Sequence, residues 1–252
     1  EEVPFVAVVS DSVYRISGKD RVKTALSVAR ALKDTLRVRQ FDAVILATGV
    51  NEKFADALSG SYLANMKKAP ILLYTNSGLS QQNVKVIKER MKSNGTVYIL
   101  GGTSAIPESV EKTLSGYKIK RLSGKNRYET NLAILKEAGV SNAKEILVAT
   151  GTNFADSLSA SAVGLPLMLV NGKGNGLNAA QIDFLKSVSG KKITIIGGDS
   201  AVSEEMKAAI EAVTGTTVAR ISGKTRYNTS VLIAQKYFPN AEAALITYAK
   251  NF

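Results

Sequence analysis

A seven-residue motif that occurs three times constrains the fold of this chain more than any other sequence feature. The pattern Arg-x-Ser-Gly-Lys-x-Arg covers residues 15–21, 121–127 and 220–226. Copies separated by about 100 residues indicate duplication of one structural unit. We therefore predict two complete repeats, residues 12–117 and 118–217, followed by a partial third repeat over residues 218–252.

Each copy of the motif follows a short β-branched run and precedes a segment with helical periodicity. This position is typical of a strand-to-helix turn, where glycine relaxes the backbone before a helix begins. Strand-like runs alternate with amphipathic helices through both repeats, which predicts an α/β fold with parallel sheets covered by helices. The expected strands lie at residues 3–9, 41–49, 69–74, 96–100, 118–120, 146–151, 166–170 and 193–196.

Helix boundaries are indicated by capping residues. Ser80 suits the N-cap of one helix, which we expect to place Met91 on its apolar face and to stop at Asn94-Gly95. Asn178 and Gln181 form a possible capping box at the corresponding place in the second repeat.

The third copy stops early. Residues 244–252 align with residues 146–154, so most strands of a third sheet have no counterpart in this sequence. A repeat without most of its sheet should not bury its own core. We therefore expect the natural protein to continue beyond this sequence.

Composition limits the chemistry that is open to the chain. It has no cysteine, so disulfides and thiolate metal sites are excluded, and it has no histidine, the commonest general base and metal ligand. Lysine and arginine outnumber aspartate and glutamate by 33 to 21, which gives a net charge of +12. Such a charge favours polyanionic partners, although it is also compatible with ordinary solubility.

Three groups of residues could bind an anion, and each has a structural alternative. The glycine pairs at 101–102 and 197–198 could offer backbone N–H groups, or could simply form tight turns, and they match neither common nucleotide-binding pattern. The paired arginines of the motif could bind phosphate or carboxylate, or could form ion pairs that hold one repeat to the next. Asp56 and Asp156 occupy matching positions where a helix dipole or cap is the simpler role.

Several motifs in fixed order resemble the type 2 cell-wall-binding repeat of clostridial and related Gram-positive surface proteins. They are Arg-(Ile/Leu)-Ser-Gly-Lys-x-Arg-Tyr-x-Thr, Ala-Thr-Gly-x-Asn-Phe-Ala-Asp-x-Leu-Ser and Ile-(Leu/Ile)-Gly-Gly-x-Ser-Ala. The first copy departs from them with Val22 in place of tyrosine and with two extra residues between Gly49 and Phe54.

The resemblance implies a non-catalytic anchoring module with Rossmann- or Toprim-like repeats. It would hold a surface protein at the extracellular cell wall by binding an anionic wall polysaccharide, with no cofactor and no metal, while a separate variable region carries the parent protein's own function. The candidate polymer contacts are Arg15, Ser17, Arg21, Arg121, Ser123, Arg127, Arg220, Arg226, Gly101, Gly102, Gly197 and Gly198.

Two other functions stay open at this point. A nucleotide- or phosphate-dependent enzyme could use the Gly-Gly turns, but the chain lacks histidine and the usual metal motifs. A nucleic-acid binder would suit the charge, but aromatic residues are only 6% of the chain, which leaves few stacking platforms.

Overall fold

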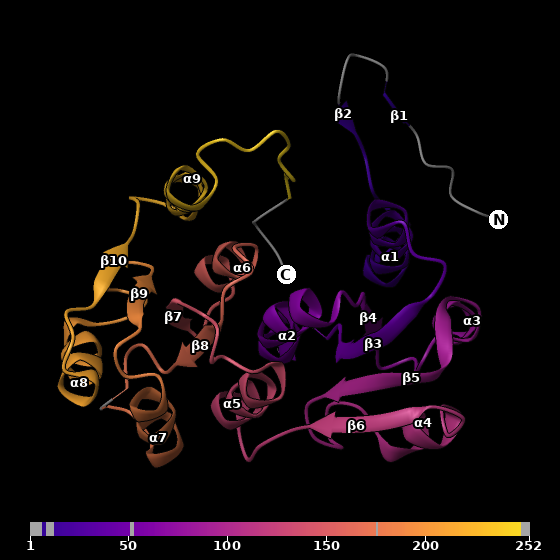
Figure 1. The fold of residues 1–252 in the computed structure, drawn as a ribbon, viewed down its shortest axis with the longest axis horizontal. Coiled ribbons are helices and arrows are strands. Elements are labelled where there is room, and N and C mark those ends of the chain that lie inside the picture. Colours follow the sequence, from indigo (N-terminus) through magenta and orange to yellow (C-terminus); the bar gives the residue numbers. More distant parts are fainter. Residues whose placement is uncertain (1–6, 9–12, 51–52, 175, 248–252) are drawn as a thin grey trace. The chain divides into compact units, whose positions relative to one another are not determined.

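A computed structural model of the protein describes residues 7–8, 13–50, 53–174 and 176–247. The backbone divides into two compact units (Figure 1). The first unit comprises residues 1–53 and 66–122, and the second comprises residues 54–65 and 123–252. Each unit is built on its own parallel sheet, so the predicted α/β fold class is confirmed.

The first unit contains a four-stranded parallel sheet in the order β4-β3-β5-β6. Its strands are β3 (Phe41–Thr48), β4 (Ile71–Tyr74), β5 (Met91–Leu100) and β6 (Lys118–Leu122). Its helices are α1 (Arg21–Leu36), α3 (Gln81–Arg90) and α4 (Glu108–Thr113). A short antiparallel pair, β1 (Ala7–Val8) and β2 (Val13–Tyr14), covers part of the first expected strand, whose other residues lie outside the described ones.

The core of the first unit forms around β3, which is apolar along almost its whole length. Val44 and Leu46 point to the same face of the sheet because side chains alternate along a strand. Both are fully buried and pack in one cluster with Leu26 of α1, Ile87 of α3 and Val110 of α4. A strand that is apolar on both faces is stable only where other elements shield it from water, so it lies in a sheet that helices pack against, as the sequence predicted.

The predicted end of α3 is wrong. The helix stops at Arg90, and Met91 has an extended backbone with φ −110° and ψ 144°. Met91 pairs with Phe41 in the sheet, and both side chains are almost completely buried. This pairing supplies core packing that a further helical turn would not, so tertiary contacts override the local periodicity.

Residues 92–95 form a bulge in β5 instead of a helix terminus. The register passes from Phe41–Met91 directly to Ala43–Thr96. A Cβ on Gly95 would lie 2.8 Å from Cγ of Met91 and 2.9 Å from the Lys92 carbonyl oxygen. Glycine is therefore required here by close approach inside the bulge, and not by a helix stop.

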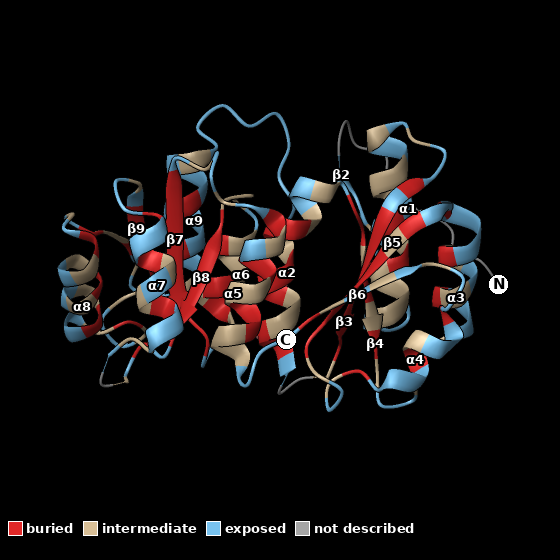
Figure 2. Cartoon of the chain, turned by 60° about the horizontal axis from the view of Figure 1, so that its bottom comes forward, coloured by how far each residue is buried: buried red, intermediate tan, exposed pale blue. Residues whose placement is uncertain are grey.

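The second unit contains the parallel sheet β10-β9-β7-β8. Its strands are β7 (Glu145–Thr150), β8 (Leu167–Val170), β9 (Lys192–Ile196) and β10 (Ala219–Ile221). Its helices are α5 (Arg127–Ala138), α6 (Ala155–Ser161), α7 (Ala179–Ser187), α8 (Glu204–Thr214) and α9 (Arg226–Tyr237). Figure 2 shows β7 and β8 buried along their lengths, as expected of strands with helical cover.

Helix α2 (Phe54–Lys67) follows the first motif in the sequence, yet residues 54–65 belong to the second unit. Phe54, Ala55 and Leu58 pack in the same core cluster as Leu147 of β7 and Leu167 of β8. The first-repeat sequence thus supplies part of the second unit's core.

Each sheet also ends with a strand that contains the first two residues of the next copy of the motif. β6, which contains Arg121, pairs with β5, and β10, which contains Arg220, pairs with β9. The last strand of each unit therefore belongs, by sequence, to the next repeat. The proposed repeat boundaries are defined by the sequence motifs alone.

The third copy of the motif forms β10 and α9, both within the second unit. Residues 244–247, which align with β7, form no strand. Leu245 and Ile246 are 87% and 96% exposed, whereas their counterparts Leu147 and Val148 are completely buried. Among the residues that the structure describes, no sheet covers the apolar side chains of this segment.

Candidate functional site

The arginine motif forms the same turn in all three copies. The backbone N–H of Gly18, Gly124 and Gly223 donates to the Thr hydroxyl six residues later, at 3.0 Å in each case. The residue before the second arginine is the N-cap of the following helix: Asp20 for α1, Asn126 for α5 and Thr225 for α9. The turn thus satisfies amides that would otherwise be unpaired at a helix start.

The motif glycine is required because the chain folds back on itself. A Cβ on Gly124 would clash with Cβ of Glu129 and would lie 2.8 Å from the backbone nitrogen of Thr130. Gly18 and Gly223 meet the corresponding atoms in the same way. Glycine is therefore required at this position because there is no room for a Cβ atom, and not because the backbone is left-handed.

We expect Gly124→Ala to destabilise the second unit by about 1–3 kcal/mol, because the first turn of α5 must move to accept the methyl group. Gly198→Ala is the control, since its nearest neighbour, Cβ of Ser222, would lie at an ordinary 3.9 Å. Urea unfolding of the two variants would measure the difference. Equal unfolding midpoints would contradict the steric explanation.

The second arginine of the motif binds a carbonyl oxygen at the end of a neighbouring strand. Nη1 of Arg21 donates to the Gly49 carbonyl, and Nη1 of Arg127 donates to the Gly151 carbonyl, both at 2.5 Å. These glycines follow β3 and β7, the strands next along the chain. The same side chain therefore joins the motif turn to the carboxyl end of the sheet in each complete repeat.

Aromatic rings of the Phe-Ala-Asp motif complete this arrangement in the second unit. The guanidinium of Arg127 lies 5.7 Å from the ring centroid of Phe54, and that of Arg226 lies 5.7 Å from the centroid of Phe154. The two rings meet edge to face with centroids 6.0 Å apart. Both contacts are within cation–π range, and each joins a phenylalanine to the arginine of the following motif copy.

The first arginine of the motif forms ion pairs in the second and third copies. Arg121 donates to the Gly101 carbonyl at 2.9 Å and through Nε to Glu111 of α4 at 2.7 Å. Its side chain is only 16% exposed, so this pair is well shielded from water. It connects the start of the second motif copy to a helix of the first sequence repeat, which is the structural alternative stated above.

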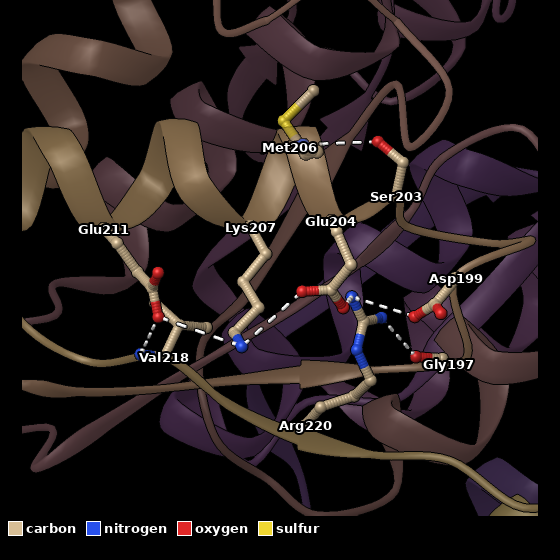
Figure 3. Close-up of polar contacts among 9 residues, drawn as sticks. All are labelled: Gly197, Asp199, Ser203, Glu204, Met206, Lys207, Glu211, Val218 and Arg220. Atoms are coloured by element: carbon tan, nitrogen blue, oxygen red, sulfur yellow. Dashed lines mark hydrogen bonds and ion pairs between the residues drawn. The ribbon is translucent and has the colours of Figure 1, made fainter.

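Arg220 makes the equivalent contacts in the second unit (Figure 3). It donates to the Gly197 carbonyl at 2.8 Å and to Glu204 at 2.8 Å, with Asp199 at 3.5 Å. The hydrogen bond from Arg220 lowers the pKa of Glu204. The guanidinium thereby holds β10 against the N-terminus of α8.

The Gly-Gly turns use their first amides within the sheet. The N–H of Gly101 donates to the Leu122 carbonyl and that of Gly197 donates to the Ile221 carbonyl, both at 2.9 Å. Gly101 and Gly197 also have φ of +96° and +115°, values that favour glycine. These observations agree with the simpler interpretation, a tight turn between strand and helix.

Within each unit, the structure brings candidate contacts together in a pair. Arg121 meets Gly101 within the first unit, and Arg220 meets Gly197 within the second. Arg15 and Ser123 are exposed, and the carbonyl of Ser17 accepts a hydrogen bond from Ser27. Gly102 and Gly198 are partly exposed beside the turns. Polymer binding by any of these residues remains a proposal.

Asp56 and Asp156 lie in the first turns of α2 and α6, where a negative charge complements the helix dipole. Burial raises the pKa of Asp156, an effect that the nearby charge of Arg226 opposes. No group of three or more carboxylates with the spacing of a metal site occurs among the described residues. None of the helices in that part of the chain is long and apolar enough to span a membrane.

Asn131 is a polar residue that sequence reasoning missed. It is completely buried on α5, and its amide group pairs with the outer edge of β8. Nδ2 donates to the Leu167 carbonyl at 2.8 Å, and Oδ1 accepts from the Leu169 N–H at 2.9 Å. Nδ2 also contacts Oγ of Ser59 at 3.0 Å. Asn131 lies three and four residues before Ile134 and Leu135, which places it on the apolar face of α5. A polar residue on that face is the sequence signal that could have revealed Asn131.

Glu145 is a second missed residue. It accepts hydrogen bonds from Thr194 at 2.5 Å and from Tyr237 at 2.8 Å, and it lies 3.5 Å from Lys192. Burial alone would raise its pKa, but these hydrogen bonds and the nearby lysines outweigh burial and lower the pKa. The cluster ties α9 to strands β7 and β9, so its evident role is structural.

Comparison with known families and proteins gives consistent matches. The sequence profile of the family described as "Cell wall binding domain 2 (CWB2)" matches residues 15–111 and 121–207. The chain is 31% identical over 237 residues to N-acetylmuramoyl-L-alanine amidase LytC of Bacillus subtilis (strain 168), covering 91% of this chain and 44% of that protein. It is 30% identical over 257 residues to the amidase enhancer of the same organism, covering 98% of this chain and 33% of that protein.

Two solved structures share the fold. Cwp8 from Clostridium difficile superposes with a TM-score of 0.76 at 31% identity, over 88% of this chain and 37% of that one. Cwp6 from the same organism has a TM-score of 0.76 at 22% identity, over 95% of this chain and 40% of that one, and this likeness concerns the fold alone. The chain spans less than half the length of each of these proteins.

Proposed function

The chain belongs to the cell wall binding domain 2 (CWB2) family, whose repeats occur in Gram-positive surface proteins, and on that premise we propose that it anchors a surface protein by binding an anionic wall polysaccharide. The proposed location is the outer face of the cell, at the wall. Binding would be non-covalent and would involve no chemical step by this chain.

The observation that carries this proposal is the combination of the family match with the charge. Two matched segments cover both complete motif copies, and the whole chain has a net charge of +12. A wall polymer with regularly spaced carboxylates or phosphates would gain electrostatic attraction from such a surface. The absence of histidine and cysteine from the sequence supports a non-catalytic role.

The arginine turns support a scaffolding role more than a direct contact for most candidate residues. Arg121 and Arg220 already bind carboxylates, and Arg21 and Arg127 bind carbonyl oxygens. The nucleotide hypothesis has less support, because the first amide of each Gly-Gly turn donates to a strand carbonyl. Exposed candidates such as Arg15 and Ser123 keep the proposed polymer role.

Retention on bead-bound polymer would test the proposed function. The protein is expected to bind an immobilised anionic wall polysaccharide at about 0.01 M NaCl and to elute near 1 M NaCl, where the screening length falls from about 30 Å to about 3 Å. Beads that carry neutral dextran are the control. Failure to bind the anionic polymer at low salt would overturn the proposal.

A further inference from the structure

Side chains of helices α1 and α3 line a basic groove in the first unit. Figure 1 labels both helices. Its volume is about 560 Å³, within the usual range of binding sites. Six basic side chains line it, against the two acidic side chains Asp34 and Glu89. The basic residues are Lys19, Lys23, Arg30, Lys33, Lys85 and Arg90.

The positive charges extend along both walls of the groove. On α1, Lys23, Arg30 and Lys33 recur at spacings of seven and three residues, which keeps them near one helical face. At a rise of 1.5 Å per residue, Lys23 and Lys33 lie about 15 Å apart along the helix axis. Lys85 and Arg90 lie on α3, on the opposite wall. Such rows suit a linear polyanion better than a single small anion.

The charges in the groove are weakly neutralised. Lys23 and Asp20 are 3.8 Å apart, and Lys85 and Glu89 are 3.9 Å apart, with at least one partner half exposed in each pair. Exposed pairs at such distances contribute little and exchange readily. Within the part of the chain that the structure describes, Arg30 and Arg90 have no ion-pair partner.

The floor of the groove is apolar. Leu26, Ala29 and Phe41 are almost completely buried there, and Val86 is partly exposed. Pyranose rings present C–H faces as well as hydroxyl and acidic groups. An apolar floor between cationic walls therefore matches the two kinds of surface on an acidic glycan.

The second unit keeps only part of this arrangement: Lys19 and Arg30 correspond to Lys125 and Lys136, but the other four basic residues have no basic counterpart. Counted from the motif arginine, the counterpart of Lys23 is Glu129. Counted from the N-cap, Lys85 and Arg90 correspond to Asp183 and Val188. In addition, α5 packs directly against α7. The basic groove is therefore a particular feature of the first unit and not a consequence of the repeat fold.

We propose that the groove between α1 and α3 binds one strand of an anionic glycan, whose acidic groups pair with the two rows of cations while its sugar rings lie on the apolar floor. This inference rests on the proposed wall-polymer function and assigns it to a site outside the repeated motif. It commits the first unit to polymer contact and leaves the second unit's α5–α7 pair as a structural element.

Charge-neutral substitution in the groove would test the assignment. The full chain would carry glutamine at four groove positions, and glutamine preserves helix propensity. The control would carry the same number of substitutions on exposed residues of the first unit that do not line the groove. The groove variant is Lys23→Gln, Arg30→Gln, Lys85→Gln and Arg90→Gln, and the control variant is Arg39→Gln, Lys88→Gln, Lys112→Gln and Lys118→Gln.

Binding would be measured by titration with polygalacturonate, an acidic glycan, and separately with poly(glycerol phosphate), a polyanion whose backbone has no sugar rings and which therefore tests charge alone. The groove variant is expected to bind polygalacturonate on the order of tenfold more weakly than the unmodified chain, since four contributions of up to about twofold each multiply. The control variant should stay within about twofold. A double variant, Arg30→Gln with Arg90→Gln, changes only two side chains, and neither has an ion-pair partner among the described residues. It provides the test if the variant with four substitutions does not fold.

The outcomes separate the groove from the wider function. If the unmodified chain binds and the groove variant binds equally well, the groove assignment is overturned while polymer binding stands. If groove and control variants weaken equally, only net charge matters and the assignment again fails. If the unmodified chain binds neither polymer, the proposed function itself fails.

Discussion

Replacing Phe54 by alanine is expected to destabilise the second unit by about 3–5 kcal/mol, although Phe54 belongs to the first repeat by sequence. Its side chain is 9% exposed and packs with Leu147 and Leu167 in the core of the second unit. The Phe54 ring also lies within cation–π range of the Arg127 guanidinium and meets the Phe154 ring edge to face. Truncation would therefore leave a cavity and remove both ring contacts.

Hydrogen exchange would show where the loss falls. Backbone amides of β7 and β9 should exchange faster in Phe54→Ala, while those of β3 and β5 should keep their protection. Phe238→Ala in the same unit is the matched control, because that side chain is 43% exposed and its loss should cost about 0.5 kcal/mol. Faster exchange confined to β3 and β5 would show that the assignment of α2 to the second unit is incorrect.

The second large effect is expected at Asn131, where alanine should cost about 3–5 kcal/mol of unfolding free energy. The substitution leaves the Leu167 carbonyl and the Leu169 N–H without their partner, and both residues are buried at the outer edge of β8. An unpaired backbone group that is shielded from water keeps its full desolvation cost.

A second variant separates hydrogen bonding from packing. Asn131→Leu restores volume without the amide and should be about as unstable as Asn131→Ala in urea unfolding. Ser230→Ala, at the matching position of α9, is exposed and should change stability by no more than about 0.5 kcal/mol. A stable leucine variant would mean that Asn131 acts through its size alone.

Local features of the fold could be predicted because they depend on neighbouring residues. Ser80 accepts from the Asn83 N–H, and Asn178 and Gln181 form the reciprocal capping box. The apolar run of β3 likewise predicted a strand that is buried on both faces. These signals lie within a few residues of the structure that they determine.

The incorrect and missing predictions all depend on distant partners. Met91 leaves α3 because Phe41, far away in the sequence, offers a strand position in the core. Residues 54–65 join the second unit through packing against β7 and β8, which no local pattern encodes. Asn131 is explained by a strand edge more than 30 residues away.

The candidate site was predicted in part for the same reason. The repeated motif identified the arginines and the glycine turns, but it could not show which atoms they contact. Arg127 binds a carbonyl 24 residues away, and Arg121 binds one 20 residues away. The basic groove was not predicted at all, because it arises from two helices that are separated in the sequence by β3, α2 and β4.

Sedimentation with cell walls tests the central claim, that this chain binds the wall through its anionic polysaccharide. Walls would be used either intact or after chemical extraction of that polysaccharide, with peptidoglycan left in place. The protein is expected to sediment with intact walls, to stay in solution with extracted walls, and to leave intact walls near 1 M NaCl, where screening acts within about 3 Å. Equal sedimentation with intact and extracted walls would contradict the claim.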